Sequence, residues 1–468
     1  MDKRQEAENL LKEYNQEHII KYLNKMDDEK AEKLIDQIHT IDFHQITELY
    51  NNTKKKIEFK ESKIEALKYL DKAKLTFEQI EKFDKLGSNI VKKGQYAVVT
   101  MAGGQGTRLG HNGPKGTFKL DVYGKGKYLF EILVDNLKEA NQKYGIIINW
   151  YIMTSKENNS ATVEFLEKNN YFGYDKNFVK IFTQSELPLI NTEGKLLMGK
   201  DYKIREASDG NGGTYSSLRR SGCLADMKEK GIKWVFIGSV DNALLKMVDV
   251  TLLGMAIDQG VQIASKSVVK ANPHERVGVF CKMNGHPKVI EYTELPEKMA
   301  EEVDSDGELK YGESHIMCNL YTIDAIEKIS KEILMYHSAF KKNSYIDENG
   351  ELKYGESHIM CNLYTIDAIE KISKEILMYH SAHKKNSYID ENGKEVVPTE
   401  PNSYKFESFI FDAFEFFDDI AILRGKREDD FAPVKNKEGV DSPKTAKELY
   451  EKFWGEKWKS AKLKIYII

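Results

Sequence analysis

The sequence predicts an α/β protein built on a sheet with parallel strands, together with a helical amino-terminal region and a small carboxy-terminal region. Two observations carry this prediction. After about residue 90, short apolar runs alternate with helix-like stretches, and this alternation is typical of α/β folds. Before that point, apolar residues recur at helical spacing. A chain of 468 residues is too long for one ordinary core, so we expect three regions: 1–90, 91–400 and 401–468.

The predicted sheet begins with the apolar run 95–101, which ends in glycines. This pattern is typical of a buried strand that enters a glycine loop. Ligands of such sheets bind at the carboxyl ends of the strands, and the glycine loop would lie there. A helix is expected over 129–143, and further strands are expected over 146–153, 179–183, 234–237 and 262–265.

The two ends of the chain show mainly helical patterns. Helical spacing of apolar residues continues through roughly the first eighty residues. Near the other end, an aromatic-rich segment spans 406–417, and a helix is expected over 443–459. The apolar tail 465–468 is compatible with either a strand or a frayed end.

Composition narrows the class of partner. The chain has 70 Lys and Arg against 74 Asp and Glu, so its net charge is −4, which favours neither nucleic acid nor an anionic membrane as a partner. No run of 18 apolar residues occurs, so we expect no membrane-spanning helix. None of the four cysteines forms a CxxC pair, so free thiols and a cytoplasmic location are expected. They are Cys223, Cys281, Cys318 and Cys361.

A tandem repeat of period 43 covers residues 307–349 and 350–392, with only Phe340 and His383 different between the copies. Structural repeats normally number three or more and diverge, so near-identity indicates a recent duplication or an error of sequence assembly or design. We expect one copy to occupy a native place. The alternative is a tolerated surface insertion of little consequence. The copies carry strand candidates at 315–322 and 358–365, and helix candidates at 324–334 and 367–377.

The glycine loop that follows the first predicted strand has the pattern of a phosphate cradle. Its glycines let the backbone turn sharply and direct N–H groups at phosphate oxygens. Arg108 can contact two oxygens, and Lys115 supplies a point charge. The dinucleotide pattern GxGxxG fails at Leu109, and the pattern GxxxxGK[ST] fails because Lys115 precedes Gly116. The substrate-binding candidates in the loop are Ala102, Gly103, Gly104, Gly106 and Thr107.

Four further features do not settle a function on their residues alone. Asp241 follows a strand, where an acid is more often a turn or helix cap but is also suited to hold Mg²⁺ beside phosphates. Gln184 carries an amide that can match the edge of uracil. Residues 209–213 have the composition of a turn. Lys435 alone would be interpreted as an exposed lysine.

The stretch 101–115 resembles the signature of UDP-N-acetylhexosamine pyrophosphorylases and related UDP-sugar pyrophosphorylases. The resemblance implies a Rossmann-like mixed sheet of the nucleotide-diphospho-sugar transferase type, which is also called GT-A-like. In this chain Ser185 stands where many relatives have glycine, and the carboxy-terminal domain is shorter than in the eukaryotic enzymes. We expect a monomer. The likeness continues through 14–18, 41–43, 182–188, 208–213, 235–242, 275–279, 289–292 and 431–436.

The resemblance also assigns roles to single residues. Arg108, Lys115 and Lys435 would act on phosphates, and Asp241 would hold Mg²⁺. Gln184 would contact the base. The remaining assignments are Gly210 beside uridine, Asn211 on the sugar, and Gly278, Glu291 and the repeat-related pair Asn319 and Asn362 around the sugar.

The activity implied is the formation of a UDP-sugar and pyrophosphate from UTP and a sugar 1-phosphate. N-acetylglucosamine 1-phosphate is the expected sugar, and glucose 1-phosphate or a broad range of sugars is the alternative. A non-catalytic protein that binds nucleotide sugars is the alternative of another class. Such a protein would be expected to lose Asp241 or the lysines, which this chain keeps.

Overall fold

A computed structural model describes residues 2–54, 63–292, 294–330 and 379–465. They form two compact units, each assembled from three segments of the chain. We call residues 1–58, 185–213 and 330–410 the helical unit, and residues 59–184, 214–329 and 411–468 the sheet unit. The three consecutive regions expected from the sequence divide the chain in a different way, and that division stays a prediction.

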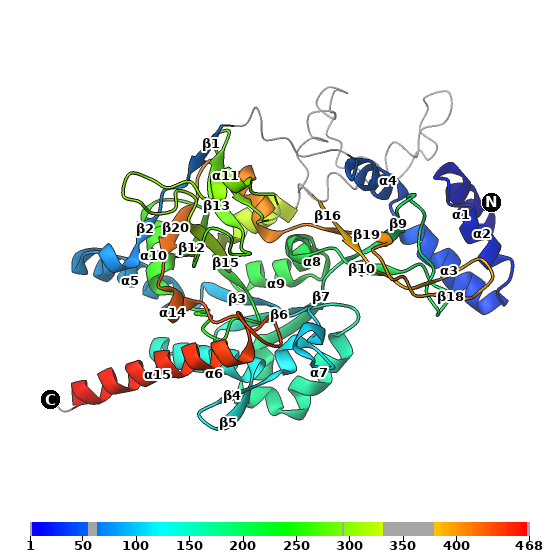
Figure 1. Cartoon of the computed structure of the whole chain (residues 1–468). Coiled ribbons are helices and arrows are strands. Elements are labelled where there is room, and N and C mark those ends of the chain that lie inside the picture. The colour runs from blue at the N-terminus through cyan, green and yellow to red at the C-terminus, as the bar shows by residue number, and fades with distance from the viewer. Residues whose placement is uncertain (1, 55–62, 293, 331–378, 466–468) are drawn as a thin grey trace. The chain divides into compact units, whose positions relative to one another are not determined.

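The sheet unit is built on a large mixed sheet (Figure 1). Along its main path every described neighbour pair is parallel except those that involve β15, which runs antiparallel to β11 and β12. β15 also pairs with β13 at one edge, where β13 continues to β1 and β14. In spatial order the path is β2 (Leu70–Asp71), β20 (Ala421–Arg424), β12 (Ile263–Val269), β15 (Glu313–Thr322), β11 (Trp234–Ser239), β3 (Tyr96–Met101), β6 (Asn149–Thr154) and β7 (Val179–Thr183).

Helices cover both faces of this sheet, which explains why β3 is buried along its whole length. Tyr96 and Val98 share an apolar core with residues of α5 (Phe77–Lys92), α6 (Leu129–Tyr144) and α10 (Val250–Asp258). On the opposite face, Tyr215 of α8 (Thr214–Arg220) donates to or accepts from Tyr321 at 2.8 Å. Tyr151 donates to Asp226 of α9 (Cys223–Glu229).

The helical unit has its own apolar core, formed between four amino-terminal helices and residues such as Ile190, Met198 and Phe406. Asp27 and Asp42 cap two of these helices by accepting from backbone N–H groups in the first turn. The helices are α1 (Lys3–Glu13), α2 (His18–Leu23), α3 (Asp28–Thr40) and α4 (Phe43–Asn52), and the strands are β8 (Glu186–Pro188), β9 (Ile190–Asn191), β10 (Glu206–Ser208), β16 (His380–Lys384), β17 (Tyr388–Ile389), β18 (Glu395–Val396) and β19 (Ser403–Glu407).

Most of the predicted elements are confirmed within a few residues of their ends. The expectation of helices through the first eighty residues is wrong at 64–71, where β1 (Ile64–Ala66) and β2 form short edge strands. Two or three residues are too few to show a strand period. The carboxy-terminal helix α15 (Pro443–Ile465) is longer than predicted, and 466–468 lie outside the described residues. The other elements are α7 (Asn159–Lys168), α11 (Glu297–Ala300), α14 (Arg427–Asp430), β4 (Lys119–Val122), β5 (Lys125–Tyr128), β13 (Val279–Met283) and β14 (His286–Ile290).

The described parts of the tandem repeat come from both copies. Residues 307–330 belong to the first copy and include β15, whereas 379–392 belong to the second copy and include β16. These two parts correspond to different portions of the 43-residue unit, so no position of the unit is described twice. The candidates at 358–365 and 367–377 lie outside the described residues.

The described cysteines, Cys223, Cys281 and Cys318, are free and buried, while Cys361 lies outside the described residues. In the part of the chain that the structure describes, no helix combines the length and the apolar character that crossing a membrane requires.

Candidate active site

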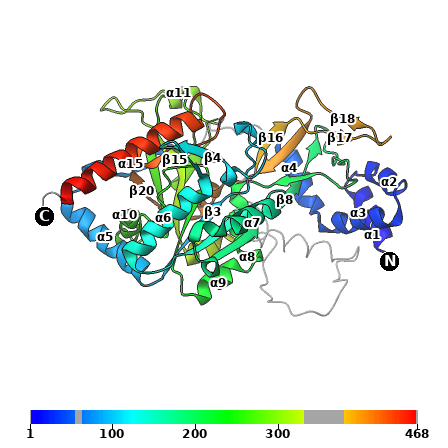
Figure 2. The same ribbon diagram turned by 90° about the horizontal axis from the view of Figure 1, so that it is seen from below.

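The carboxyl ends of parallel strands bring the predicted phosphate-binding residues to one edge of the sheet. Figure 2 shows β3 and β15 of this sheet from below. In the ladder, Ser239 at the end of β11 pairs with Met101 at the end of β3, and Met101 pairs with Met153 near the end of β6. The glycine loop follows β3, Asp241 follows β11, and Gln184 follows β7. The strand order therefore gathers three candidates that lie up to about 140 residues apart in the sequence.

The glycine loop is closed by its own backbone. Gln105 and Pro114 form an antiparallel bridge, Gly106 N–H donates to Gly113 O at 2.9 Å, and Lys115 N–H donates to Gly104 O at 3.0 Å. These bonds hold the half of the loop that carries Arg108 against the half that carries Lys115. Thr107 and Arg108 at its tip are exposed, whereas Ala102 and Gly106 are buried.

Gly103 lies directly against the amide of Gln184. A Cβ atom at position 103 would come within 2.8 Å of Gln184 Oε1, so only glycine fits here without displacing that side chain. Gln184 is 6% exposed, and its backbone N–H donates to Thr154 O at 2.8 Å. Close approach thus places the proposed base-contacting amide beside the start of the phosphate loop. By contrast, a Cβ at Gly104 would meet no atom within 4 Å.

Lys115 and Asp241 form an ion pair at the centre of this edge, with 3.1 Å between Lys115 Nζ and Asp241 Oδ2. Their side chains are only 11% and 15% exposed. Burial raises the pKa of the Asp241 carboxyl. The charges of Lys115 and Lys435 and a hydrogen bond with Ser239 lower it by more than burial raises it, so the net pKa is below the ordinary value. Asp241 is therefore a carboxylate at neutral pH.

The segment that carries Lys435 is tied to the segment that carries Asp241. Asn242 and Pro433 form an antiparallel bridge, and Val434 N–H donates to the backbone oxygen of Asp241 at 2.8 Å. The Lys435 ammonium is 3.8 Å from Asp441. These contacts explain how a lysine almost 200 residues beyond Asp241 comes close enough to lower the pKa of its carboxyl.

Three of the residues predicted to contact the sugar, Gly278, Glu291 and Asn319, lie on β13, β14 and β15 or directly beside them. A Cβ at Gly278 would meet Val289 Cγ1 at 2.7 Å and Glu291 Oε1 at 3.1 Å, so Gly278 and Glu291 are neighbours. Asn319 is fully buried on β15. Its Oδ1 accepts from Ser265 at 2.7 Å, while its Nδ2 has no hydrogen-bond partner among the described residues. A buried amide donor of this kind is costly unless something bonds it.

A bulge in β15 shapes the surroundings of Asn319. Its register against β12 shifts between Ser265 and Ser267, and Met317 has a φ of 57°. In a regular strand two residues four apart are roughly 13 Å apart. Here four residues along β15 oppose only two along β12, so the bulge brings His315 Nε2 to 3.0 Å from Asn319 Oδ1 and this contact fixes the orientation of the amide.

The remaining candidates are placed elsewhere. Gly210 and Asn211 belong to the helical unit, where a Cβ at Gly210 would meet the backbone oxygen of Ser408 at 2.3 Å. Gly210 also has a φ of 88°, so packing and backbone conformation alone require glycine. Asn211 Oδ1 accepts from Ile410 N–H at 2.7 Å. Asn362 lies outside the described residues.

Sequence reasoning missed the residues that hold the site in shape. Buried Asn158 donates from Nδ2 to Ala102 O at 3.0 Å and to Gly104 O at 3.4 Å, which fixes the start of the glycine loop. Its position after a strand end, with Ser155 three residues before it, is a turn signal that could have been noticed. His315 gave no such signal, because only the bulge brings it to Asn319.

Comparison with known proteins identifies the family. Residues 41–357 match the family model described as UTP–glucose-1-phosphate uridylyltransferase. The chain belongs to this family. It is 33% identical to the UDP-N-acetylglucosamine pyrophosphorylase of Saccharomyces cerevisiae over 80% of this chain and 72% of that protein. It is 30% identical to a probable UDP-N-acetylglucosamine pyrophosphorylase of Dictyostelium discoideum over 92% of this chain and 84% of that protein.

A solved structure gives the same result for the fold. The UDP-N-acetylglucosamine pyrophosphorylase of Trypanosoma brucei, crystallised with an inhibitor, superposes with a TM-score of 0.73 at 27% identity, covering 96% of this chain and 84% of that one. The resemblance that the sequence motifs predicted is thereby confirmed, and so is the mixed α/β fold with its mostly parallel sheet. The chain is a nucleotidyltransferase of the uridylyltransferase class.

Proposed function

We propose that this chain transfers a uridylyl group from UTP to N-acetylglucosamine 1-phosphate, with release of pyrophosphate. The observation that carries the proposal is the meeting of Arg108, the Lys115–Asp241 pair and the Lys435 segment at one edge of the sheet. The names of the relatives support the choice of sugar. We also propose that the sheet unit is of the GT-A-like, nucleotide-diphospho-sugar transferase type, and that the protein acts in the cytoplasm as a monomer.

The chemistry proposed is an in-line displacement. An oxygen of the sugar phosphate attacks the α-phosphorus of UTP, the new P–O bond forms as the bond to the β-phosphate breaks, and pyrophosphate leaves. The nucleophile is already an anion, so no general base is required. The barrier comes from bringing two polyanions together, which positioned cations relieve. Exposed Arg108 would hold the triphosphate with Lys115, and Lys435 would steady the sugar phosphate or the α-phosphate.

The residues present fit Mg²⁺ only as an ion shared with the substrate. Asp241 is a lone carboxylate, and the described residues include no group of three or more His, Cys, Asp or Glu side chains able to enclose a metal. Mg²⁺ is commonly held by one or two carboxylates together with substrate phosphates. When bound, the ion would screen phosphate charge. Asp241 would exchange its contact with Lys115 for the ion, which would free the Lys115 ammonium for a phosphate oxygen.

Recognition of the base and the sugar would use amides and one carboxylate. Gln184 offers an acceptor and donors to the uracil edge, and Gly103 keeps that amide close to the phosphates. The partnerless Nδ2 of Asn319 is a donor suited to a sugar oxygen, and Glu291 would accept from a hydroxyl. Gly210 and Asn211 are proposed to contact the uridine and the sugar.

The test is a pyrophosphate-release assay with UTP and a panel of sugar 1-phosphates. We expect the highest kcat/KM with N-acetylglucosamine 1-phosphate. A higher value with glucose 1-phosphate, which the description of the family model names, would reassign the sugar. No release with any sugar would refute an enzymatic function and leave a nucleotide-sugar-binding protein as the alternative.

A further inference from the structure

A buried charge cluster lies next to the Lys435 segment and has no part in the chemistry described above. It consists of Lys266, Asp249, Asp430 and Lys246. Lys266 Nζ is 2.5 Å from Asp249 Oδ2 and 2.7 Å from Asp430 Oδ1, and all three side chains are 5% exposed or less. Lys246 adds a second ammonium 3.0 Å from Asp430 Oδ1. Such a cluster needs an explanation, because burying charges costs several kcal/mol per ion before pairing.

Stability does not supply that explanation, since apolar side chains of similar volume often replace a buried ion pair without loss. What a buried ion pair adds is a fixed position of one chain segment relative to another, because the two charged groups must stay in contact. Lys266 lies on β12 at the point where its register against β15 shifts, and it pairs in the parallel ladder with Leu423 of β20. Its ammonium thus extends from the rigid sheet to two separate segments, one through each aspartate.

One of those segments leads directly to the candidate site. We call residues 425–436 the Lys435 loop. Asp430 lies within it, and its backbone oxygen accepts from Asn242 Nδ2 at 2.8 Å. Asn242 Oδ1 accepts in turn from Ala432 N–H at 2.9 Å. Asn242 is the next residue after Asp241. A continuous series of contacts therefore runs from Lys266 through Asp430 and Asn242 to Asp241, whose carboxylate is influenced by both Lys115 and Lys435.

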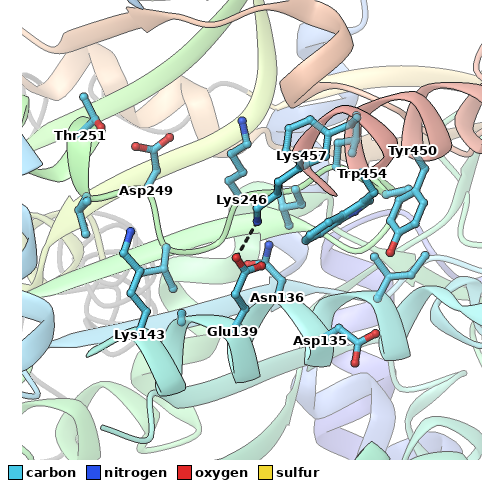
Figure 3. Close-up of a pocket in the computed structure, with 18 of the residues that line it drawn as sticks. Asp135, Asn136, Glu139, Lys143, Lys246, Asp249, Thr251, Tyr450, Trp454 and Lys457 are labelled. Atoms are coloured by element: carbon cyan, nitrogen blue, oxygen red, sulfur yellow. Dashed lines mark hydrogen bonds and ion pairs between the residues drawn. The ribbon is translucent and has the colours of Figure 1, made fainter. Parts of the chain in front are cut away.

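The other segment leads away from the site. Asp249 caps α10, accepting from Leu252 N–H at 3.1 Å. Together with Lys246 it lines a cavity of about 350 Å³ between α6, the residues before α10, and α15 (Figure 3). None of the predicted site residues lines this cavity. Asp249 and Asp430 therefore share one partner and similar burial, but only Asp430 belongs to the Lys435 loop.

We propose that Lys266 is a positioning residue for uridylyl transfer, which holds the Lys435 loop in register with Asp241 through its ion pair with Asp430. This inference rests on the proposed function, because it assigns importance to where Lys435 lies. Lys266 is 1% exposed and its ammonium pairs with two aspartates, so it would act through Asp430 and not by contacting the substrate. Its effect is to keep the loop closed over the Asn242 contacts, so that the Lys435 ammonium stays beside the reacting phosphates rather than sampling open positions.

The experiment compares Asp430→Asn with Asp249→Asn, which serves as the matched control. Each change removes one carboxylate charge from Lys266 and leaves the other Lys266 ion pair intact. Each also removes the partner of a second lysine, which is Lys246 for Asp430 and Lys72 for Asp249. We expect Asp430→Asn to lower kcat about tenfold, and Asp249→Asn to change it less than about twofold. In a Lys435→Ala background Asp430→Asn should have almost no further effect, because the group that it positions is gone.

Hydrogen exchange gives a second measurement that does not depend on turnover. The Val434 and Lys435 amides, which donate to Asp241 O and Asp441 O, should exchange faster in Asp430→Asn than in the unchanged chain or in Asp249→Asn. Equal effects of the two variants on kcat and exchange would refute the positioning role, as would an Asp430→Asn effect that multiplies with that of Lys435→Ala. Failure of the unchanged chain to release pyrophosphate would instead refute the proposed function, and the exchange comparison would still decide whether Asp430 holds the loop.

Discussion

His315 should make the folded chain sensitive to mild acid. Its ring is nine-tenths buried among aromatic rings, with centroids 5.3 Å from Phe280, 5.2 Å from Phe411 and 5.9 Å from Phe414. Burial lowers the pKa of the imidazole to about 4, although the hydrogen bond with Asn319 opposes this shift. The neutral ring carries its proton on Nε2, since it must donate to Asn319 Oδ1.

The direction and size of the effect follow from proton linkage. A histidine of the unfolded chain has a pKa of about 6.5, so between about pH 6.5 and 4 the unfolded state binds more protons than the folded state. The contribution of His315 to stability is complete above that window and is lost as the pH falls through it. Lowering the pH from about 7.5 to 5 should remove roughly 2 kcal/mol from the free energy of unfolding through this group alone.

The assay is urea unfolding at these two pH values, for the unchanged chain and for His315→Gln. Glutamine keeps a donor for Asn319 but does not titrate, and the carboxylates that titrate in the same range are common to both proteins. The loss of stability on acidification should therefore be smaller by roughly 2 kcal/mol in the variant. Equal losses of stability in the two proteins would show that the His315 pKa is the same in the folded and the unfolded chain, and that burial does not lower it.

Three further predictions concern the phosphate loop and the repeat. Arg108→Ala and Lys115→Ala should each lower kcat by about two orders of magnitude, and near-normal turnover in the pyrophosphate assay would exclude the residue from the mechanism. The unfolding temperature should change little in Arg108→Ala, because Arg108 is exposed, but should fall in Lys115→Ala, because that change removes the 3.1 Å partner of the nearly buried Asp241 carboxylate. Gly103→Ala should displace the Gln184 amide and raise KM for UTP by about tenfold or more, with a smaller effect on KM for the sugar phosphate; equal changes in both KM values would contradict a role in base recognition. Deletion of 331–373, which joins Ser330 to the identical continuation of the second copy, should leave turnover within about twofold and the unfolding temperature equal or higher, since the connection is shorter; a chain that fails to fold would refute this.

The sequence was sufficient for the parts of this protein in which a local pattern and a structural role coincide. The run from Tyr96 to Met101 is apolar because both faces of β3 are covered, and it ends in glycines because the next segment must turn at a sheet edge. The same holds for α6 and β7, which have nearly the predicted bounds. Short edge strands carry no such pattern, and β1 and β2 were missed because their partners, β13 and β20, lie hundreds of residues away.

The residues of the candidate site also fall into two groups, those that a sequence motif indicates and those that only the fold reveals. Lys115 could be proposed from the glycine loop, and Asp241 from the family resemblance of the strand end that precedes it, and the structure brings their charged atoms within 3.1 Å. The residues that hold them cannot be proposed in this way, because a buried lysine such as Lys266 looks in the sequence like any strand lysine on a solvated face. Its meaning comes only from the two carboxylates that meet it, and these arrive from the start of α10 and from the Lys435 loop. For this fold, then, motifs in the sequence indicate which groups act on phosphate, whereas the precision of their placement depends on long-range ion pairs that only the folded chain reveals.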